Sequence, residues 1–307
     1  MRYRTIADVR GTTALRPSIT PIVVIFRNDF EQVAKLLLSI EASIIEAGCS
    51  AKPPIVVIND DEAPSFYLSR HTWTVVAGHG NVGFGAAVNI AIPYATSDYI
   101  FIVNPDCQAE PSELQSLFAE AVKHDMVLYA PLVKTPSGAI DYKMYENWTF
   151  TPFRRASLLI SYVFFNISRR QTLCRGIKLP GTAIVTTKST ALSLGSIFDE
   201  QFFLYGEDRD LALRCRRIGI EQRVVRSSNI VHIGGESGAG IEDFVQTEKI
   251  KSNLRIAMNR YGRLGFEVLA WNLRAESWIK DRLRGTRTSV KVRSDVMACR
   301  RQLEEAI

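Results

Sequence analysis

The chain has 307 residues, of which 46% are hydrophobic and 23% charged, and its formal net charge is +6. This composition is that of a globular protein with a sizeable core, and it excludes a largely disordered chain. The basic excess fits nucleic acid, anionic lipid or anionic small substrates as partners, but the sequence has no zinc-finger spacing and no RNA-binding run of basic and aromatic residues, so nucleic acid is not expected.

The first half of the chain alternates β-branched runs with segments of helical spacing. We expect strands at residues 21–26, 54–58, 73–77 and 99–103, and helices at residues 31–47, 84–94 and 111–124. This alternation predicts an α/β fold with a mostly parallel, doubly wound sheet. Ligands bind such sheets at the carboxyl ends of the strands. The acids that follow predicted strands, Asp60, Asp61 and Asp106, should therefore converge on one crevice.

The second half is less regular. Strands are expected at 126–132, 181–187, 224–225 and 230–232, and the chain is helical and basic from residue 248. The apolar run at 157–167 is too short to span a membrane, so we expect a buried helix there, with a membrane-surface segment as the alternative. These patterns divide the chain into a lead-in (1–19), a main domain (20–247) with a variable insert (135–178), and a basic helical C-terminal extension (248–307).

The cysteines indicate a compartment. The five are scattered and form no CxxC pair: Cys49, Cys107, Cys174, Cys215 and Cys299. This spacing argues against a disulfide framework and against a structural zinc site. The N-terminal residues contain no apolar stretch typical of a secretory signal. We therefore expect a cytoplasmic protein.

A glycine-rich string, Gly78-His79-Gly80-Asn81-Val82-Gly83, follows a predicted strand and precedes a predicted helix. It matches the dinucleotide-binding fingerprint, which favours a nicotinamide-dependent oxidoreductase. However, the strand is not the first of the sheet, and the next strand ends in Asn-Pro-Asp. The alternatives are a tight turn with close helix packing, or a close approach of backbone to a nucleotide.

The segment from Phe202 to Arg214 has three acids and two arginines within eight residues, after an aromatic lead-in. One interpretation is an amphipathic helix start, because acids are favoured in the first turn of a helix. The other is a catalytic carboxylate in an apolar surround, which raises its pKa. The neighbouring acids act in the same direction and the arginines oppose them, so the sequence leaves the balance open.

Two further groups suit a metal site. Asn104-Pro105-Asp106 ends a buried strand, and a carboxylate there could hold a divalent cation against a diphosphate. The alternative is a turn-capping aspartate. His232 lies on an apolar edge, where it could be a further ligand or a satisfied core histidine.

Four motifs in this order carry a resemblance. They are residues 81–89 (NVGFGAAVN), residues 104–106 (NPD), residues 198–211 (FDEQFFLYGEDRDL) and residues 232–237 (HIGGES). Over residues 20–260 the chain resembles the family 2 glycosyltransferases, whose fold is GT-A, a Rossmann-like sheet flanked by helices. Within that family it is similar to the rhamnosyltransferase-like branch.

The resemblance implies roles for particular residues. It places the donor nucleotide at Arg27, Asn28, Asp60, Asn81 and Gly83. The family's Asp-Asn after the second strand is replaced by Asn59-Asp60-Asp61, so which of these contacts the base stays open.

The metal and catalytic residues follow from the same resemblance. Mg²⁺ or Mn²⁺ is expected at Asp106 with help from His232, although Asn104 replaces the first acid of the family's metal motif. Asp208 is expected to be the catalytic base. Glu207, Arg209 and Asp210 are expected to support it or to orient the acceptor.

The resulting hypothesis is an inverting glycosyltransferase. Its donor would be a nucleotide sugar, first of all dTDP-L-rhamnose, and its acceptor a glycan or lipid-linked intermediate of envelope assembly. The basic insert and extension would lie against an anionic membrane, or would simply be solvated. The alternatives are the nicotinamide-dependent oxidoreductase and a non-catalytic sugar-nucleotide-binding protein.

Overall fold

The computed structural model describes residues 16–62, 67, 72–147, 154–167, 173, 176–234, 242–285 and 287–305. Its strands are β1 (Ser18–Ile25), β2 (Ser50–Ala51), β3 (Ile55–Ile58), β4 (Thr74–Val76), β5 (Tyr99–Val103), β6 (Cys107–Gln108), β7 (Val127–Lys134), β8 (Ala183–Thr187) and β9 (Glu221–His232). Its helices are α1 (Phe30–Glu46), α3 (Phe84–Ala91), α4 (Pro111–Ala121), α5 (Arg154–Ile167), α6 (Lys188–Ser193), α7 (Glu207–Ile218), α8 (Glu242–Arg284) and α9 (Thr288–Glu305), with short 3₁₀ turns η1 (Ile92–Tyr94) and η2 (Tyr142–Tyr145).

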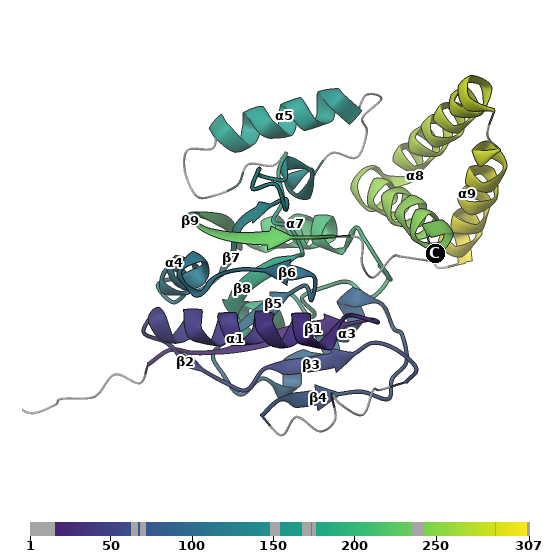
Figure 1. Cartoon of the computed structure of the whole chain (residues 1–307). Helices are drawn as coiled ribbons and strands as arrows, with labels where there is room; N and C mark the ends of the chain where they lie inside the picture. Colours follow the sequence, from purple (N-terminus) through teal and green to yellow (C-terminus); the bar gives the residue numbers. More distant parts are fainter. Residues whose placement is uncertain are drawn as a thin grey trace, which may run out of the picture.

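One mixed sheet forms the centre of the molecule, in the order β4-β3-β1-β5-β8-β7-β9-β6, with β2 beside β1 (Figure 1). The four strands β4, β3, β1 and β5 are parallel, and β8 then joins β5 in the antiparallel sense. This is the mostly parallel α/β sheet that the sequence predicts, and the predicted strands of the first half are confirmed. The residues of β3 are buried on both faces, as expected of a central parallel strand.

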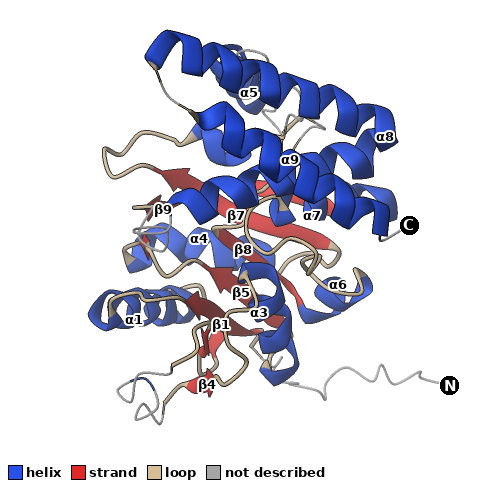
Figure 2. Cartoon of the chain, turned by 90° about the vertical axis from the view of Figure 1, so that its right-hand side faces the viewer, coloured by secondary structure: helices blue, strands red, loops and turns tan. Residues whose placement is uncertain are grey.

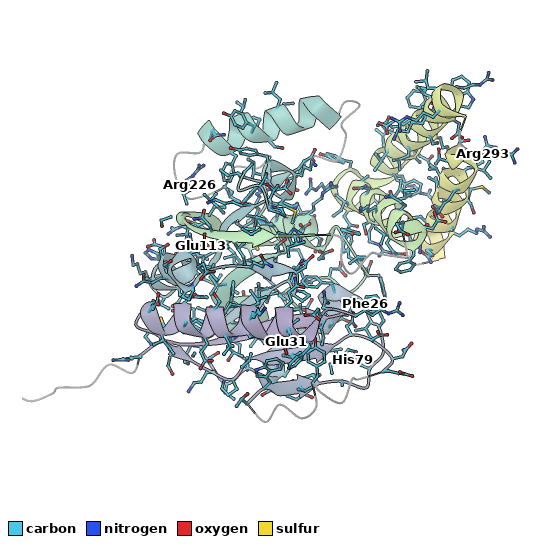
Figure 3. The ribbon with its side chains drawn as sticks, in the orientation of Figure 1. Phe26, Glu31, His79, Glu113, Arg226 and Arg293 are labelled. Atoms are coloured by element: carbon cyan, nitrogen blue, oxygen red, sulfur yellow. The ribbon has the colours of Figure 1, made fainter. Side chains whose placement is uncertain are left out.

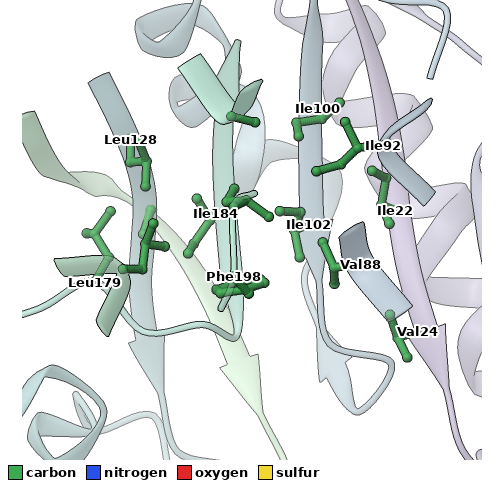
Figure 4. Packing of buried hydrophobic residues seen from close by; sticks show 14 of the residues in the cluster. Ile22, Val24, Val88, Ile92, Ile100, Ile102, Leu128, Leu179, Ile184 and Phe198 are labelled. Atoms are coloured by element: carbon green, nitrogen blue, oxygen red, sulfur yellow. The ribbon is translucent and has the colours of Figure 1, made fainter. Parts of the chain in front are cut away.

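Helices cover both faces of the sheet (Figure 2). One face packs against α1 and α4 through a cluster that includes Leu37, Ile40 and Phe118. The other packs against α3 and α7. Figure 4 shows how side chains from neighbouring strands, such as Ile22, Ile102 and Ile184, meet Val88 and Phe198 in that layer. The two layers fix the positions of the strand ends that carry the polar motifs.

The second half differs from the sequence prediction in one strand. Residues 224–225 and 230–232 belong to the single strand β9, in which Arg226 to Ser228 bulge out between the residues that pair with Pro131 and Leu132 of β7. A register shift in β7 between Pro131 and Leu132 accommodates the extra residues of β9.

The prediction of a buried helix at 157–167 was wrong in its burial. The segment lies in helix α5, but Leu159, Ile160, Tyr162, Val163 and Phe164 are exposed. The helix rests on the rest of the molecule through Ser161 and Phe165, whose ring packs 4.6 Å from that of Tyr145 in η2. The ring of Tyr162 also lies 5.0 Å from that of Tyr142, so α5 rests on the molecule through one side of the helix.

The C-terminal extension is a helical hairpin made of α8 and α9. Helix α8 bends at Gly262, whose φ of 66° and ψ of −159° are not helical. The two limbs of α8 and helix α9 enclose a core of their own around Leu254, Phe266 and Val296. Among the described residues, none of the helices combines the length and apolar character needed to cross a bilayer.

Candidate active site

A cavity of about 1130 Å³ lies at the carboxyl ends of the parallel strands. Its wall on the sheet side includes Val24 and Phe26 from the end of β1 and Asn59 after β3. Figure 3 shows Phe26 at this end of the sheet, on the side that faces the C-terminal hairpin. The opposite wall comes from the start of α7 and from both limbs of α8. The crevice expected from the sequence is therefore present, and the hairpin forms its opposite wall. Of the three acids expected to converge there, Asp106 lines the wall, and Asp60 and Asp61 do not.

Asn59 organises the glycine-rich loop. It is buried, and its Nδ2 donates to Oδ1 of Asn81 at 3.0 Å while its Oδ1 accepts from the backbone N–H of Val82 at 3.0 Å. Asn81 Oδ1 also accepts from the N–H of Gly83 at 3.1 Å. Of the three polar residues after β3, Asn59 is the one that lines the cavity. The sequence left this assignment open.

Gly83 has a packing role that requires glycine. Its φ is 88°, and a Cβ atom there would lie 2.3 Å from the carbonyl oxygen of Phe203. The same oxygen accepts a hydrogen bond from the N–H of Phe84 at 3.1 Å. At the other end of α3, Asn89 donates to the carbonyl oxygen of Phe198 at 2.8 Å. Two contacts thus join the glycine-rich loop and α3 to the acidic segment. This is the close packing that the sequence left open as one alternative for the glycine-rich string.

The other residues predicted for the nucleotide lie just outside the cavity wall. Arg27 has a φ of 59°, and its side chain is 67% exposed, with Nε 3.4 Å from Oδ2 of Asp60. Asn28 accepts from the N–H of Phe26 at 2.9 Å, and its buried Nδ2 has no hydrogen-bond partner among the described residues. Their roles toward a nucleotide stay predictions.

The Asn-Pro-Asp turn follows β5 and is fixed by backbone bonds. The N–H of Asn104 donates to Thr182 O at 2.8 Å, and the N–H of Ile233 donates to Asp106 O at 3.0 Å. Pairing of β6 with β9 places His232 beside the turn, with Nε2 3.3 Å from Oδ1 of Asp106. Asp106 and His232 are far apart in the sequence, but they lie side by side in the cavity wall.

The donor set of this turn fits a hard divalent cation. Asp106 Oδ1 and Asn104 Oδ1 are buried, and neither accepts a hydrogen bond from the described part of the chain. Within that part, no three or more His, Cys, Asp or Glu side chains gather closely enough to hold a metal by themselves. A cation here would take one carboxylate, with further oxygens from a diphosphate and water, as Mg²⁺ and Mn²⁺ commonly do.

Asp208 lies at the second residue of α7, where a strained turn presents it to the cavity. Tyr205 and Gly206 have φ values of 66° and 86°, and the helix starts immediately after them. The carboxylate Oδ2 of Asp208 accepts a short hydrogen bond from Nζ of Lys178, and the same ammonium donates to the carbonyl oxygen of Met144 at 2.7 Å. The free N–H groups at the helix start also favour a carboxylate here.

Glu207 is a buried acid with an unusual environment. Burial raises its pKa to about 8, and the charge of Asp208 acts in the same direction. The backbone N–H of Glu207, Lys178 and Arg209 oppose the shift. Its Oε2 has no hydrogen-bond partner among the described residues. At neutral pH this side chain is therefore largely protonated, next to an ion-paired Asp208.

The remaining predicted residues of the segment divide into two groups. Arg209 lines the cavity and donates to Oδ1 of Asn253 on α8 at 2.7 Å. Asp210 lies outside the cavity wall, where its Oδ2 accepts from Nε of Arg214 at 2.5 Å. Arg214 in turn donates to the carbonyl oxygens of Ser196 and Ile197. Asp210 therefore anchors α7 to the preceding loop.

Lys178 is a cavity residue that the sequence did not single out, and Asn59 is the one of the three candidates after β3 that lines the cavity. Lys178 lies at the end of the variable insert, and its contact with Asp208 depends on the fold alone. Asn59 stands beside two acids that appear better suited to a ligand. The site thus combines a carboxylate in a cation pair, a buried neutral acid, and an oxygen-rich turn. This set can accept a proton and, through a divalent cation held at the turn, bind a diphosphate.

Comparisons with known proteins agree with this arrangement. The model of glycosyl transferase family 2 matches residues 22–178, about half of the chain. A curated N-acetylglucosaminyl-diphospho-decaprenol L-rhamnosyltransferase of Mycobacterium tuberculosis is 21% identical, over 86% of this chain and 92% of its own length. The mannosyltransferase of Pyrobaculum calidifontis, solved with GDP-mannose and Mn²⁺, superposes with a TM-score of 0.51 at 13% identity, over 93% of this chain and 81% of the other.

The fold is therefore that of a GT-A enzyme, and the site adds a carboxylate at the start of α7 to an oxygen-rich turn. The chain belongs to glycosyl transferase family 2. It is a glycosyltransferase, and the oxidoreductase alternative is not favoured.

Proposed function

We propose that the enzyme transfers a sugar, with inversion, from a nucleotide-sugar donor to a lipid-linked or glycan acceptor. L-Rhamnose from dTDP-L-rhamnose is the first candidate, because the relative from M. tuberculosis is a rhamnosyltransferase that acts on a diphospho-decaprenol acceptor, as its name states. The single observation that carries the proposal is the position of Asp208, whose carboxylate lies in the wall of the cavity that also contains the Asn-Pro-Asp turn.

In this proposal Asp208 is the catalytic base. The acceptor hydroxyl transfers its proton to the Asp208 carboxylate while its oxygen bonds to the anomeric carbon of the donor. The bond from that carbon to the diphosphate breaks, and the nucleoside diphosphate leaves with the electron pair. One displacement gives inversion, and a general base of this kind contributes roughly 10²- to 10⁴-fold to the rate.

The nucleotide would lie against the strand ends. Asn59, Asn81 and Phe26 line this part of the cavity, and Asp106 with His232 lies at its inner end. A divalent cation held at Asp106 would neutralise the leaving diphosphate. The mannosyltransferase complex, which contains Mn²⁺, supports a divalent metal without deciding between Mg²⁺ and Mn²⁺.

The acceptor would enter between α7 and α8. This wall carries Arg209 and Asn253, which are joined by a hydrogen bond, and the apolar Leu269 and Leu273. Glu207, protonated at neutral pH, supports the turn that positions Asp208. A cytoplasmic location, from which a nucleotide sugar is available, is part of the same proposal.

The test is a donor screen that measures nucleotide release with and without Mn²⁺, followed by the variant Asp208→Asn. We expect release with one donor, dependent on divalent metal, and a loss of about 10²-fold or more in the variant. Nucleotide binding by the variant, measured as a rise in Tm, should be unchanged. Retained transfer would remove Asp208 from the role of base. Nucleotide binding without transfer by the parent enzyme would instead favour the non-catalytic alternative.

A further inference from the structure

The second limb of α8 exposes a continuous apolar stripe. Leu264 and Trp271 are 76% and 72% exposed, and Val268 and Trp278 lie on the same side of the helix at helical spacing. A soluble surface helix normally places such residues against a core. The limb already has a core face, in which Phe266 and others pack against α9, so the stripe is a separate face of the same helix.

A third face of this limb forms the cavity wall. Leu269, Asn272, Leu273, Glu276 and Lys280 line the cavity, and they follow each other at the spacing of one helical face. The exposed stripe lies on neighbouring turns of the same limb, about a third of a turn away around the helix axis. Substrates bound in this part of the cavity therefore lie one helix diameter from the stripe.

Helix α5 extends the apolar area. Its exposed side chains include Leu159, at 63%, and Tyr162, at 48%. Figures 1 and 2 show α5 and the second limb of α8 at the same end of the molecule, opposite β4. We define the α5–α8 surface as the exposed apolar residues of both helices: Leu159, Tyr162, Val163, Phe164, Leu264, Val268, Trp271, Trp278 and Leu283.

The charges beside this surface are mostly positive. Residues 263–287 contain six arginine or lysine residues and three acids. The acids are engaged: Glu267 pairs with Arg300 at 2.6 Å, Glu276 lies 3.9 Å from Lys280, and Asp281 accepts from the start of α9. The guanidinium of Arg282 lies 5.2 Å from the ring centre of Trp278. Exposed tryptophan with arginine is typical of protein at a lipid headgroup layer.

We propose that the α5–α8 surface docks on an anionic lipid bilayer. The apolar side chains enter the headgroup and acyl boundary, and Arg282, Arg284 and Arg287 contact the anionic headgroups. The inference deepens the proposed function, because an acceptor carried on a lipid would then reach the cavity along α8. Docking itself needs neither donor nor acceptor, so it can be tested separately from transfer.

The experiment is flotation of the full chain with two kinds of vesicle. One is phosphatidylcholine alone, and the other is phosphatidylcholine with about 30% of the anionic lipid phosphatidylglycerol. Three variants are compared with the parent: Leu264→Ser/Trp271→Ser, Arg284→Gln/Arg287→Gln, and the control Leu38→Ser. Leu38 is 67% exposed on α1, on another side of the molecule. Tm and the shift caused by a nucleoside diphosphate show that each variant is folded.

We expect the parent and the control to float with anionic vesicles, and to bind less as salt increases. The Leu264→Ser/Trp271→Ser variant should lose about tenfold or more in vesicle partitioning. The arginine variant should lose a similar factor on anionic vesicles and show little difference on neutral ones. An unchanged partitioning of either double variant overturns the proposal. So does a parent that stays unbound, or a parent dimer that the serine variant converts to a monomer.

Failure of the proposed function would look different. A chain that binds vesicles but releases no nucleotide from any donor would retain the docking surface and lose the transferase assignment. A chain that transfers sugar to a soluble acceptor analogue but does not bind vesicles would support the transferase assignment and contradict the docking surface.

Discussion

The ammonium group of Lys178 donates one hydrogen bond to the carboxylate of Asp208 and another to the carbonyl oxygen of Met144. The side chains of Lys178 and Asp208 are only 7% and 16% exposed, so the pair is largely shielded from solvent. This geometry ties the position of the proposed base to η2, on which α5 rests. It also directs Oδ2 of Asp208 to Lys178, in the wall of the cavity.

Replacing Lys178 should therefore affect turnover more than donor binding. For Lys178→Met we expect kcat to fall about 10- to 100-fold, because small displacements of a catalytic group are costly. The KM for the donor should change little, and Lys178→Arg should recover part of the loss. Steady-state kinetics with the donor identified above provide the measurement.

Lys188→Met is the matched control, because its ammonium also donates to a carbonyl oxygen, that of Ala95 at 2.7 Å, away from the cavity. It should lower Tm without lowering kcat. Equal kinetic constants for Lys178→Met and the parent would show that the ion pair has no part in positioning Asp208.

Glu207 should make stability depend on pH. Burial raises its folded pKa to about 8 from a usual value of 4.5, so between these values the folded chain holds a proton that the unfolded chain releases. Its contribution is fully present below about pH 4.5 and is lost as the pH rises toward about pH 8. Glu207→Gln has no carboxyl group to titrate, so its free energy of unfolding should not show this decrease. Relative to the parent, the variant should gain a few kcal/mol as the pH rises from about 4.5 to about 8.

Urea unfolding at a series of pH values provides the measurement, with Glu41→Gln as the control because Glu41 is exposed on α1. The control should follow the parent at every pH. A Glu207→Gln variant that differs from the parent by the same amount at low and high pH would contradict the shifted pKa.

Gly83 and Gly78 allow a test of close packing at constant backbone geometry. Their φ values are 88° and 89°, but only at Gly83 would a Cβ meet another atom, Phe203 O at 2.3 Å. Both alanine variants pay for the left-handed conformation, roughly 1–2 kcal/mol. Gly83→Ala should cost at least about 2 kcal/mol more, because the Phe203 turn must move. Chemical denaturation measures the free energy of unfolding of both variants. Equal decreases would contradict the prediction, because they would show that the Phe203 turn moves aside at little cost.

Asp106 and Asp60 should differ in their relation to metal. A nucleoside diphosphate is expected to raise the Tm of the parent more when Mn²⁺ is present. Asp106→Asn should remove the part that depends on Mn²⁺, because the substitution takes away the only acidic oxygen of the Asn-Pro-Asp turn. Asp60→Asn should leave the metal dependence intact, whatever it does to the affinity. Differential scanning fluorimetry with and without EDTA separates them, and full metal dependence in Asp106→Asn would exclude the turn as the metal site.

The strands were predictable where local chemistry decides them. Runs such as Ile55–Ile58 are β-branched, buried on both faces and followed by polar residues, so one short stretch carries the whole signal. Strand β9 was read as two pieces, because Arg226 to Asn229 look like a turn in isolation. Arg226 to Ser228 bulge between two stretches of β9 that pair with β7, and the sequence does not show that partner strand.

The site follows the same division. Asp106, His232 and Asp208 were found through motifs, and the structure brings all three to one cavity. Lys178 was missed and Asn59 was left as one of three candidates, since their contacts are with residues 30 and 22 positions away and no local spacing reports them. The supporting pair of Asp210 with Arg214 was within reach, because residues four apart face each other on a helix.

The bend at Gly262 has a wider consequence for how such enzymes diversify. The hairpin has its own core, while the rest of the cavity wall is built from residues that precede the hairpin, between Val24 and His232. The two ends of the reaction are thus encoded in separate stretches of chain. Under the proposed function, exchange of the hairpin would change the acceptor that is glycosylated and leave the donor sugar unchanged, so the two specificities could evolve independently.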